Sequence, residues 1–330
     1  MAMKSIVVYA TDENYVKLTA VSIYSLLKSN PLVDIAVFTD RISAQSVSLL
    51  TCIAKRFDST VKLIDANQEL GELQSQNIPG YTSYSVYSRY IAAKKLSKEY
   101  DRFLQVDSDT LITGSIDNLL NLTLNGKAYA IGYDCIHNSY KKIIDLEAHK
   151  RYFNCGIFLV DIKKWIEREC SERFFSCLAK NKKKTLILPD QDIVAHCLAE
   201  DATILPPQYN FLTHFQMFKT RNDVLRATGI PATAWYTEEQ YAVARKNPVI
   251  HHFLGHTLGR PWYKESLNPL RPLYRQIAVE AGLPEVAEQS RPIDLGYRMQ
   301  YLAWKTLPHA LFSYACRAMY AYFFHTRYEV

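Results

Sequence analysis

Two aspartates, Asp107 and Asp109, flank Ser108 directly after the apolar run 102–106. Carboxylates at positions i and i+2 can both reach one divalent cation when the chain bends after a strand. Oxygen ligands of this kind suit Mg²⁺ or Mn²⁺ that also binds a diphosphate. A short acidic triplet is also common as a solvated turn, which is the more frequent case for such a triplet alone. The spacing therefore fits either a metal site or a polar turn.

Two related chemistries fit the triplet less well. A haloacid-dehalogenase phosphatase needs Asp-x-Asp-x-Thr, but the threonine here, Thr110, comes one position early. A calcium-binding EF-hand loop needs an oxygen ligand at its fifth position, where this chain has Leu111.

Polar residues later in the chain could line the same site. A glycine inside an apolar strand allows a ligand to approach the backbone, and acids at a helix start match its positive end. Each feature also has a structural explanation: a packing glycine, a helix cap or a buried core histidine, and for the histidine alone the core is favoured. The residues concerned are Asn154 and Gly156, Pro189-Asp190-Gln191-Asp192, His252, Gly255 and Arg260.

The elements that must position these residues follow from hydrophobic periodicity. Short apolar runs alternate with helical spacing, which predicts an α/β fold with a mostly parallel sheet and helices on both faces. One helix around Ala20–Leu27 should end at Asn30-Pro31, and another should run from its cap Ser43 to Phe57. Buried strands are predicted at 5–10, 34–39, 60–65 and 102–106, and further strands at 127–132, 152–160 and 249–253.

Ligands of such sheets bind beyond the carboxyl ends of the strands. This rule selects Ala10-Thr11-Asp12 after the first strand and the aspartate triplet after the fourth. Segments 71–85 and 206–236 are rich in Gly, Pro, Tyr, Asn and Gln, and we expect them to be loops over the site.

Composition excludes several classes of protein. The 330 residues are 48% hydrophobic and 22% charged, which is typical of a folded protein rather than a disordered one. No apolar run approaches the roughly 20 residues of a membrane span, and the first run is too short for a signal peptide. Seven cysteines without a CxxC pair predict reduced, buried thiols in a cytosolic protein. A net charge of +6 suits an anionic small molecule or membrane surface, and no nucleic acid is expected.

Residues 295–330 differ from the rest of the chain. They contain ten aromatic residues, four Lys or Arg and one acid, Glu329. Aromatic rings and basic side chains on one helix are typical of an amphipathic segment at an anionic lipid surface. The alternative is a helix that packs its aromatic side chains onto the protein.

Taken in order, these segments resemble glycosyltransferase family 8, the retaining enzymes that include glycogenin and bacterial lipopolysaccharide and lipooligosaccharide galactosyl- and glucosyltransferases. The bacterial lipooligosaccharide branch is the most similar. The resemblance covers residues 4–263 and implies a GT-A fold, in which a Rossmann-like sheet merges with an acceptor-binding half. It implies a catalytic domain at 1–265 and a helical, membrane-associating region at 266–330. The matching motifs are Ala10-Thr11-Asp12-Glu13-Asn14-Tyr15, Tyr87-Ser88-Arg89-Tyr90, Asp107-Ser108-Asp109, Phe153-Asn154-Cys155-Gly156, Asp190-Gln191-Asp192 and His252-Phe253-Leu254-Gly255.

The resemblance also implies roles for individual residues. The metal, Mn²⁺ or less plausibly Mg²⁺, would be bound by Asp107, Asp109 and His252. The donor sugar would contact Arg89, Asp109, Asn154, Asp190 and Gln191, and the last two are the candidate catalytic residues. The nucleotide would contact Ala10, Thr11, Asp12, Asn14, Tyr15, Ser108, Gly255 and Arg260.

One motif departs from the family. The family's Gly-x-x-Lys-Pro-Trp has two extra residues here and an arginine, Arg260, in place of lysine. A guanidinium can still neutralise a leaving phosphate through two hydrogen bonds.

The function implied is Mn²⁺-dependent, retaining transfer of galactose or glucose from a UDP-hexose to a saccharide or glycolipid, at the cytoplasmic face of the cell membrane. Two alternatives stay open. A sugar-nucleotide pyrophosphorylase would need a glycine-rich basic turn after the first strand, where Ala10-Thr11-Asp12-Glu13 stands. An inert membrane-surface or scaffold protein could keep the same fold.

Overall fold

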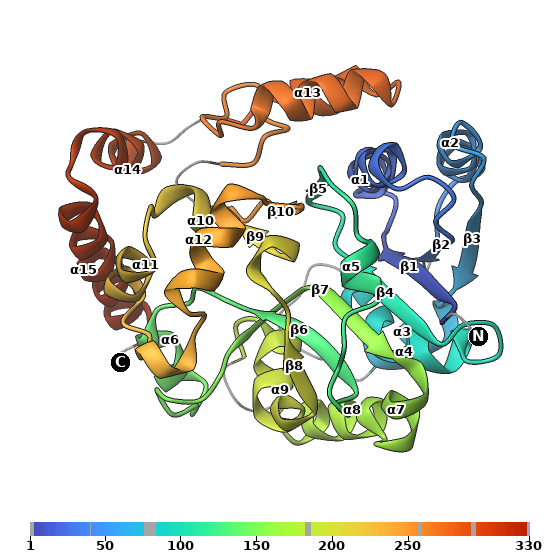
Figure 1. Ribbon diagram of the computed structural model, residues 1–330, viewed down its shortest axis with the longest axis horizontal. Helices are drawn as coiled ribbons and strands as arrows, with labels where there is room; N and C mark the ends of the chain where they lie inside the picture. The colour runs from blue at the N-terminus through green and yellow to red at the C-terminus, as the bar shows by residue number, and fades with distance from the viewer. Residues whose placement is uncertain are drawn as a thin grey trace. The chain divides into compact units, whose positions relative to one another are not determined.

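The computed structural model describes residues 3–39, 41–75, 84–181, 186–255, 259–291 and 295–328. The chain forms two compact units (Figure 1), and each unit is built from two separate segments. The first unit contains Met1–Gly132 and Phe153–Leu205, and the second contains Tyr133–Tyr152 and Pro206–Val330. The sequence predicts a catalytic domain at 1–265 and a membrane-associating region at 266–330. This division by function is not the division into compact units, and it stays a prediction.

A seven-stranded sheet forms the core of the first unit. Its strands are, in spatial order, β3 (Val61–Asp65), β2 (Ile35–Thr39), β1 (Ser5–Ala10), β4 (Arg102–Val106), β7 (Phe153–Asp161), β6 (Tyr129–Tyr133) and β8 (Ala202–Ile204). The pairs β1–β2, β1–β4, β2–β3 and β6–β8 are parallel, whereas β4–β7 is antiparallel. Because β7 runs against β4, the start of β7 lies at the same sheet edge as the end of β4.

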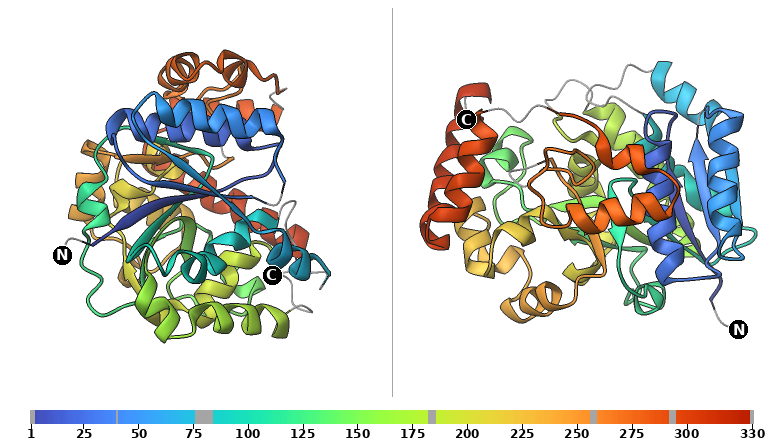
Figure 2. Two further views of the ribbon diagram at one scale, coloured as in Figure 1. Left: turned by 90° about the vertical axis from the view of Figure 1, so that its right-hand side faces the viewer. Right: turned by 90° about the horizontal axis from the view of Figure 1, so that it is seen from above.

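Helices cover both faces of this sheet, as the sequence predicts (Figure 2). One face carries α1 (Val16–Ser29) and α2 (Ala44–Lys55), and the other carries α4 (Ser88–Leu96), α7 (Ile162–Glu167) and α8 (Cys170–Lys180). Helix α9 (Pro189–Cys197) packs against α8 and β7. The unit also contains β5 (Thr110–Ile112), α3 (Asn67–Ser75), α5 (Asp117–Leu120) and 3-10 turns at Tyr84–Tyr87 and Ala199–Asp201.

Three expectations about this unit need correction. The run 60–65 is a strand but not a buried one, because β3 is the edge strand and its residues are partly or fully exposed. Residues 71–75 are helical rather than loop, and 76–83 lie outside the described residues. None of the seven cysteines forms a disulfide, yet Cys52 is exposed and Cys177 and Cys197 are only partly buried.

The second unit is mainly helical around the parallel pair β9 (Phe211–Leu212) and β10 (Ile250–His252). The segment 206–236 is therefore not a loop. Its polar residues begin and end helices: Thr220 and Asp223 form a capping box, and Gly229 ends α11 with φ +72°. The helices are α6 (Asn138–Ile143), α10 (Thr213–Met217), α11 (Arg221–Thr228), α12 (Glu238–Lys246), α13 (Arg271–Glu280), α14 (Leu295–Thr306) and α15 (His309–Tyr328), with 3-10 turns at Pro207–Tyr209, Ala232–Ala234 and Pro284–Glu288.

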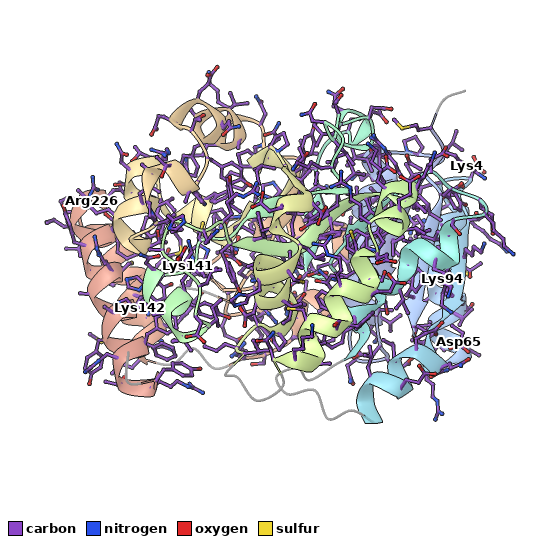
Figure 3. All side chains as sticks on the ribbon, turned by 90° about the horizontal axis from the view of Figure 1, so that it is seen from below. Lys4, Asp65, Lys94, Lys141, Lys142 and Arg226 are labelled. Carbon is purple, nitrogen blue, oxygen red and sulfur yellow. The ribbon has the colours of Figure 1, made fainter. Side chains whose placement is uncertain are left out.

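Helix α15 packs one face onto α11 and α6 within this unit. Phe312 is buried with its ring 5.8 Å from that of Phe218, and Ser313 accepts a hydrogen bond of 3.2 Å from Arg226, which Figure 3 labels. Further along, the Phe324 ring lies 6.0 Å from the ring of Tyr140 on α6. Part of the predicted aromatic face is thus a packing surface.

Candidate functional site

The chain turns sharply where β4 ends at Val106. The backbone N–H of Asp107 donates to the Gly156 carbonyl of β7 at 2.9 Å, which continues the ladder by one bond. The Thr110 hydroxyl donates to the Asp107 carbonyl at 2.8 Å and closes the turn. This turn presents Asp107 and Asp109 at the carboxyl end of β4, the edge where the sequence predicts ligand binding.

Arg89 of α4 is the central cation of this edge. Its Nη2 donates to Asp107 Oδ1 at 2.7 Å, and its Nη1 donates to the Cys155 carbonyl and lies 3.9 Å from Asp190 Oδ2. Burial alone would lower the pKa of Arg89, but the charges of Asp107 and Asp190 outweigh burial and raise it. The guanidinium is 2% exposed and stays charged, so it fixes two carboxylates from distant parts of the chain.

Asn154 and Gln191 form a second linked pair. Gln191 Oε1 accepts hydrogen bonds of 3.3 Å from Asn154 Nδ2 and from the Cys155 backbone N–H. Asn154 Oδ1 in turn accepts from the Gly156 N–H at 3.1 Å. These contacts hold the Gln191 amide of α9 against Asn154 of β7.

Asp190 and Gln191 occupy the first turn of α9, which begins at Pro189 as predicted. Both are almost fully buried, at 3% and 7% exposure. Asp192 accepts from the N–H groups of Ile187 and Leu188 at 3.1 and 3.2 Å, so it fastens the helix start. The two acids therefore have different partners: Asp192 binds the backbone at the start of the helix, and Asp190 lies near Arg89.

The loop after β1 supplies the predicted nucleotide contacts. Asp12 Oδ1 accepts from the N–H groups of Asn14 and Tyr15 at 2.9 and 3.1 Å, which starts α1. The neighbouring Ala10 and Thr11 are held against β2, since the Thr11 N–H donates to the Phe38 carbonyl at 3.0 Å. Tyr15 is 40% exposed, and its ring could stack on a base.

In the second unit, His252 lies on β10 and is 3% exposed. Its Nδ1 lies 3.0 Å from Asn210 Oδ1. An amide oxygen only accepts, so the proton belongs on Nδ1 and the lone pair on Nε2, the state of a metal-ligating histidine. The core placement that the sequence favours for an isolated histidine is correct, and it is compatible with a ligand role.

The predicted phosphate-binding segment follows β10. The Arg260 guanidinium lies over the Trp262 ring at 5.3 Å, and a Cβ at Gly255 would meet Arg260 Nε at 3.7 Å. Residues 256–258 of this motif lie outside the described residues.

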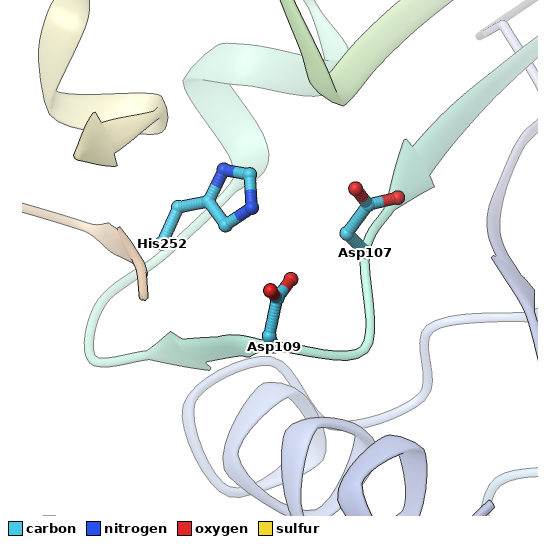
Figure 4. A group of neighbouring side chains, drawn as sticks. All are labelled: Asp107, Asp109 and His252. Carbon is cyan, nitrogen blue, oxygen red and sulfur yellow. The ribbon is translucent and has the colours of Figure 1, made fainter. Parts of the chain in front are cut away.

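Asp107, Asp109 and His252 are a candidate metal-binding group (Figure 4). Each offers one ligand atom, and these atoms all lie within 4.8 Å of one another. Two carboxylates with one imidazole suit Mn²⁺ better than Mg²⁺, which prefers oxygen alone.

Two functional groups of this region escaped the sequence analysis. Asn210, which orients His252, carries no recognisable pattern in its segment Pro207-Gln208-Tyr209-Asn210. The Cys155 carbonyl, which accepts from Arg89, is a backbone atom and has no signature in the residue types.

Comparison with known proteins gives consistent results. Residues 6–266 match the family described as "Glycosyl transferase family 8". A lipopolysaccharide 1,2-glucosyltransferase of Escherichia coli is 27% identical over 263 residues, which are 77% of this chain and 72% of that protein. A lipopolysaccharide 1,3-galactosyltransferase of Salmonella typhimurium is 26% identical over 285 residues, 80% and 81% of the two chains.

Solved structures agree with the expected fold. A crystal structure of the galactosyltransferase LgtC with donor and acceptor sugar analogues superposes with a TM-score of 0.65 at 19% identity, over 89% of this chain and 99% of that one. The WbbM bifunctional glycosyltransferase gives a TM-score of 0.66 at 19% identity, over 86% and 52%. The GT-A fold predicted from the sequence is confirmed.

Proposed function

Since the chain belongs to glycosyl transferase family 8, we propose that it transfers galactose or glucose from a UDP-hexose to a saccharide hydroxyl, with retention at the anomeric carbon. The observation that carries this proposal is Arg89, a buried arginine that contacts Asp107 of the aspartate triplet and lies beside Asp190 of α9. This arrangement joins the motif expected to bind the diphosphate to the motif expected to bind the sugar.

The metal site is the first part of the proposed mechanism. Asp107, Asp109 and His252 would bind Mn²⁺, or less well Mg²⁺, which supplies electrostatic stabilisation of the departing diphosphate. Asn210 holds the imidazole in the ligating tautomer. Arg260 would add a second positive charge to the same phosphates.

The donor pocket is the second part. Asn154, Asp190, Gln191 and Arg89 would hydrogen-bond the sugar hydroxyls, and Asp190 would place a negative charge near the anomeric carbon. Gln191 Oε1 already accepts two hydrogen bonds from β7, which makes it a weak nucleophile. This supports a positioning role for Gln191. The reaction then proceeds either through Asp190 as nucleophile or by a same-face route in which the leaving phosphate takes the acceptor proton.

The acceptor is proposed from the relatives. Two of them are named as glycosyltransferases of lipopolysaccharide. We therefore propose a glycolipid acceptor of the lipopolysaccharide or lipooligosaccharide kind.

A screen of sugar nucleotides tests the reaction. The purified protein is incubated with UDP-glucose, UDP-galactose or UDP-N-acetylglucosamine, in Mn²⁺, in Mg²⁺ and in EDTA, and released UDP is measured. We expect release with one of the two hexoses, strongest in Mn²⁺ and absent in EDTA. The Asp109→Ala variant is the matched control and should be inactive in every condition. Equal release by Asp109→Ala after EDTA treatment and Mn²⁺ restoration would exclude the metal site, and no release from any sugar would favour an inert scaffold.

Membrane association is proposed from the exposed side of α14 and α15. None of the described helices is long and apolar enough to cross a bilayer. On α14, Leu295, Met299 and Leu302 recur at helical spacing with 73%, 63% and 61% exposure. On α15, Leu311 and Tyr322 are also exposed, although its opposite face packs on α11. Soluble proteins rarely expose such rows without a partner.

The charges beside these side chains indicate the partner. Residues 295–328 contain no acid, and the four basic residues there are all exposed: Arg298, Lys305, Arg317 and Arg327. Each basic residue gains about 1 kcal/mol near an anionic lipid surface. We propose that the protein lies at the cytoplasmic face of the cell membrane, where α14 and α15 contact lipid.

Sedimentation with liposomes tests this surface. Deleting 295–330 would also remove Phe312 from its packing site, so substitution is the better design. We expect Met299→Ser combined with Leu302→Ser to reduce binding to phosphatidylglycerol liposomes while UDP release is retained. Val243→Ser, an exposed apolar residue of α12, is the matched control. Unchanged binding by the double variant, or no binding by the parent protein at low salt, would make the tail purely structural.

A further inference from the structure

Helix α1 buries a row of hydroxyl side chains: Thr19, Ser22 and Ser25. Their spacing of three residues places them on one helical face, and each is at most 1% exposed. Burying a hydroxyl is unfavourable unless it is hydrogen-bonded. These buried hydroxyls therefore need hydrogen-bond partners if the fold is to be stable.

The partners are alternate residues of the segment that carries the aspartate triplet, and β5 packs beside α1 (Figure 1). Thr19 Oγ1 lies 2.7 Å from Ser108 Oγ, and Ser22 Oγ lies 2.7 Å from Thr110 Oγ1. Ser25 Oγ accepts from the Ile112 N–H at 3.0 Å. Each step of three residues on the helix thus matches a step of two on the extended segment.

The Thr19 hydroxyl has three oxygen atoms within hydrogen-bond distance. Its Oγ1 lies 2.7 Å from Ser108 Oγ, 2.8 Å from Thr11 Oγ1 and 3.1 Å from the Tyr15 carbonyl. A hydroxyl has one proton to donate and two lone pairs that accept, so Thr19 can donate to Tyr15 or Thr11 and accept from Ser108 at the same time. Thr11 and Tyr15 belong to the loop after β1, and Ser108 stands between the two aspartates.

We infer that Thr19 is a positioning residue that sets the aspartate triplet against the nucleotide-binding loop. Its hydroxyl fixes Ser108, and Ser108 sets the backbone from which Asp107 and Asp109 extend. Thr19 itself is fully buried, so its effect on the site passes through Ser108 and Thr11. The inference rests on the proposed function, because it assumes that the triplet binds Mn²⁺ together with UDP.

Metal binding provides the test. Mn²⁺ affinity is measured in the presence of UDP, by the electron paramagnetic resonance signal of free Mn²⁺, together with the melting temperature. Thr19→Val keeps the shape and removes the hydroxyl, and we expect Mn²⁺ to bind about tenfold more weakly, the size of other effects on ligand orientation. Thr19→Ser restores the hydroxyl and should restore the affinity. Should Thr19→Val fold poorly, Ser108→Ala breaks the same bond from the other side and should weaken binding equally.

Ser25→Ala is the matched control for stability. It removes a hydroxyl from the same buried row, but its partner is the N–H of Ile112, beyond the triplet. We expect a lower melting temperature and Mn²⁺ affinity close to that of the parent protein. Parent-like Mn²⁺ binding by Thr19→Val, or equal weakening by Ser25→Ala, would overturn the inference. Failure of the parent protein to bind Mn²⁺ with UDP would instead overturn the proposed function on which it rests.

Discussion

At the scale of single residues, the site contains a buried arginine, Arg89, that is shared by two carboxylates. Arg89 is buried with Asp107 at 2.7 Å and Asp190 at 3.9 Å. A buried charge that loses a partner destabilises the protein unless another partner remains. Because Arg89 has two carboxylates, either one can be neutralised while the arginine keeps an ion pair.

Asp190→Asn uses this redundancy. The change keeps the shape of the side chain and removes the charge that we propose lies near the anomeric carbon, and Asp107 still pairs with Arg89. We expect turnover to fall by a factor of about 10² to 10³, the usual cost of losing one transition-state contact, with UDP affinity unchanged. Steady-state kinetics and UDP titration measure the two quantities. An unaltered turnover number would move the catalytic centre away from α9.

Asn210→Leu tests the orientation of His252. Removing the acceptor at 3.0 Å from Nδ1 takes away the contact that favours the tautomer protonated on Nδ1. Removing such a partner typically costs a factor of about 10 to 100 in metal affinity. We expect the Mn²⁺ concentration for half-maximal UDP release to rise by that factor, with activity recovered at saturating Mn²⁺. A variant with unchanged Mn²⁺ dependence would show that Asn210 does not orient the ligand.

At the scale of elements, Glu13 connects the loop after β1 to the start of α2. Its carboxylate accepts from the Ser43 N–H and the Ser46 hydroxyl, both at 2.8 Å, and from the Ser43 hydroxyl at 2.9 Å. These hydrogen bonds, led by the one from the Ser43 backbone, lower the pKa of Glu13. A depressed glutamate pKa stabilises the fold above the unfolded-state value, and this stabilisation is lost as pH falls through the folded-state value.

Glu13→Gln therefore has a pH-dependent effect. We expect the variant to melt at a lower temperature than the parent protein at pH 7, because a neutral amide accepts these bonds more weakly. The difference should shrink as the pH falls through the lowered pKa of Glu13, where the parent side chain is also neutral. Melting curves across this range measure it, and a difference independent of pH would assign the effect to packing instead.

The two faces of α15 should respond differently to substitution. Phe312 is 2% exposed and packs on Phe218, whereas Tyr322 is 71% exposed. Phe312→Ala should lower the free energy of unfolding by about 3 to 5 kcal/mol, the range for large aromatic core truncations. Tyr322→Ala should leave stability nearly unchanged and weaken liposome binding. Chemical denaturation compares them, and similar losses of stability would contradict the division into a packed and a lipid-facing side.

The sequence predicts elements well where periodicity is strong. The strands around β1, β2, β4 and β7 and the Ser43 cap of α2 are confirmed, because apolar runs and caps are local properties. The antiparallel direction of β7 is not a local property, and neither is the edge position of β3. The prediction of a loop at 206–236 is wrong because residues that favour turns also cap short helices.

The candidate site shows the same limit. The family resemblance selects Arg89, Asn154, Asp190 and Gln191, and the structure brings these four together beside β7. The hydroxyl row of α1 was overlooked, because the apolar positions Ala20, Ile23, Tyr24 and Leu27 account for the helix without it. Their link to residues 108–112 is a tertiary contact, which becomes visible only in the structure.

At the scale of the whole molecule, ligand binding should be visible as thermal stabilisation. A ligand that binds only the folded chain adds about 2.7 kcal/mol at one hundred times its dissociation constant. We expect UDP with Mn²⁺ to raise the melting temperature by a few degrees, and UDP with EDTA to raise it much less. Differential scanning fluorimetry measures this. An equal shift in EDTA would mean that the nucleotide binds without the metal.

The division of each unit into two chain segments affects how the protein is made. The chain passes from one unit to the other after residues 132, 152 and 205. A ribosome adds about 5 to 20 residues per second from the N-terminus, so the first sheet cannot close until β7 and β8 have been synthesised. By then α6 has already emerged, and Tyr140 must wait for Phe324 of α15. The nascent chain therefore exposes the α6 side of that contact until α15 has been synthesised.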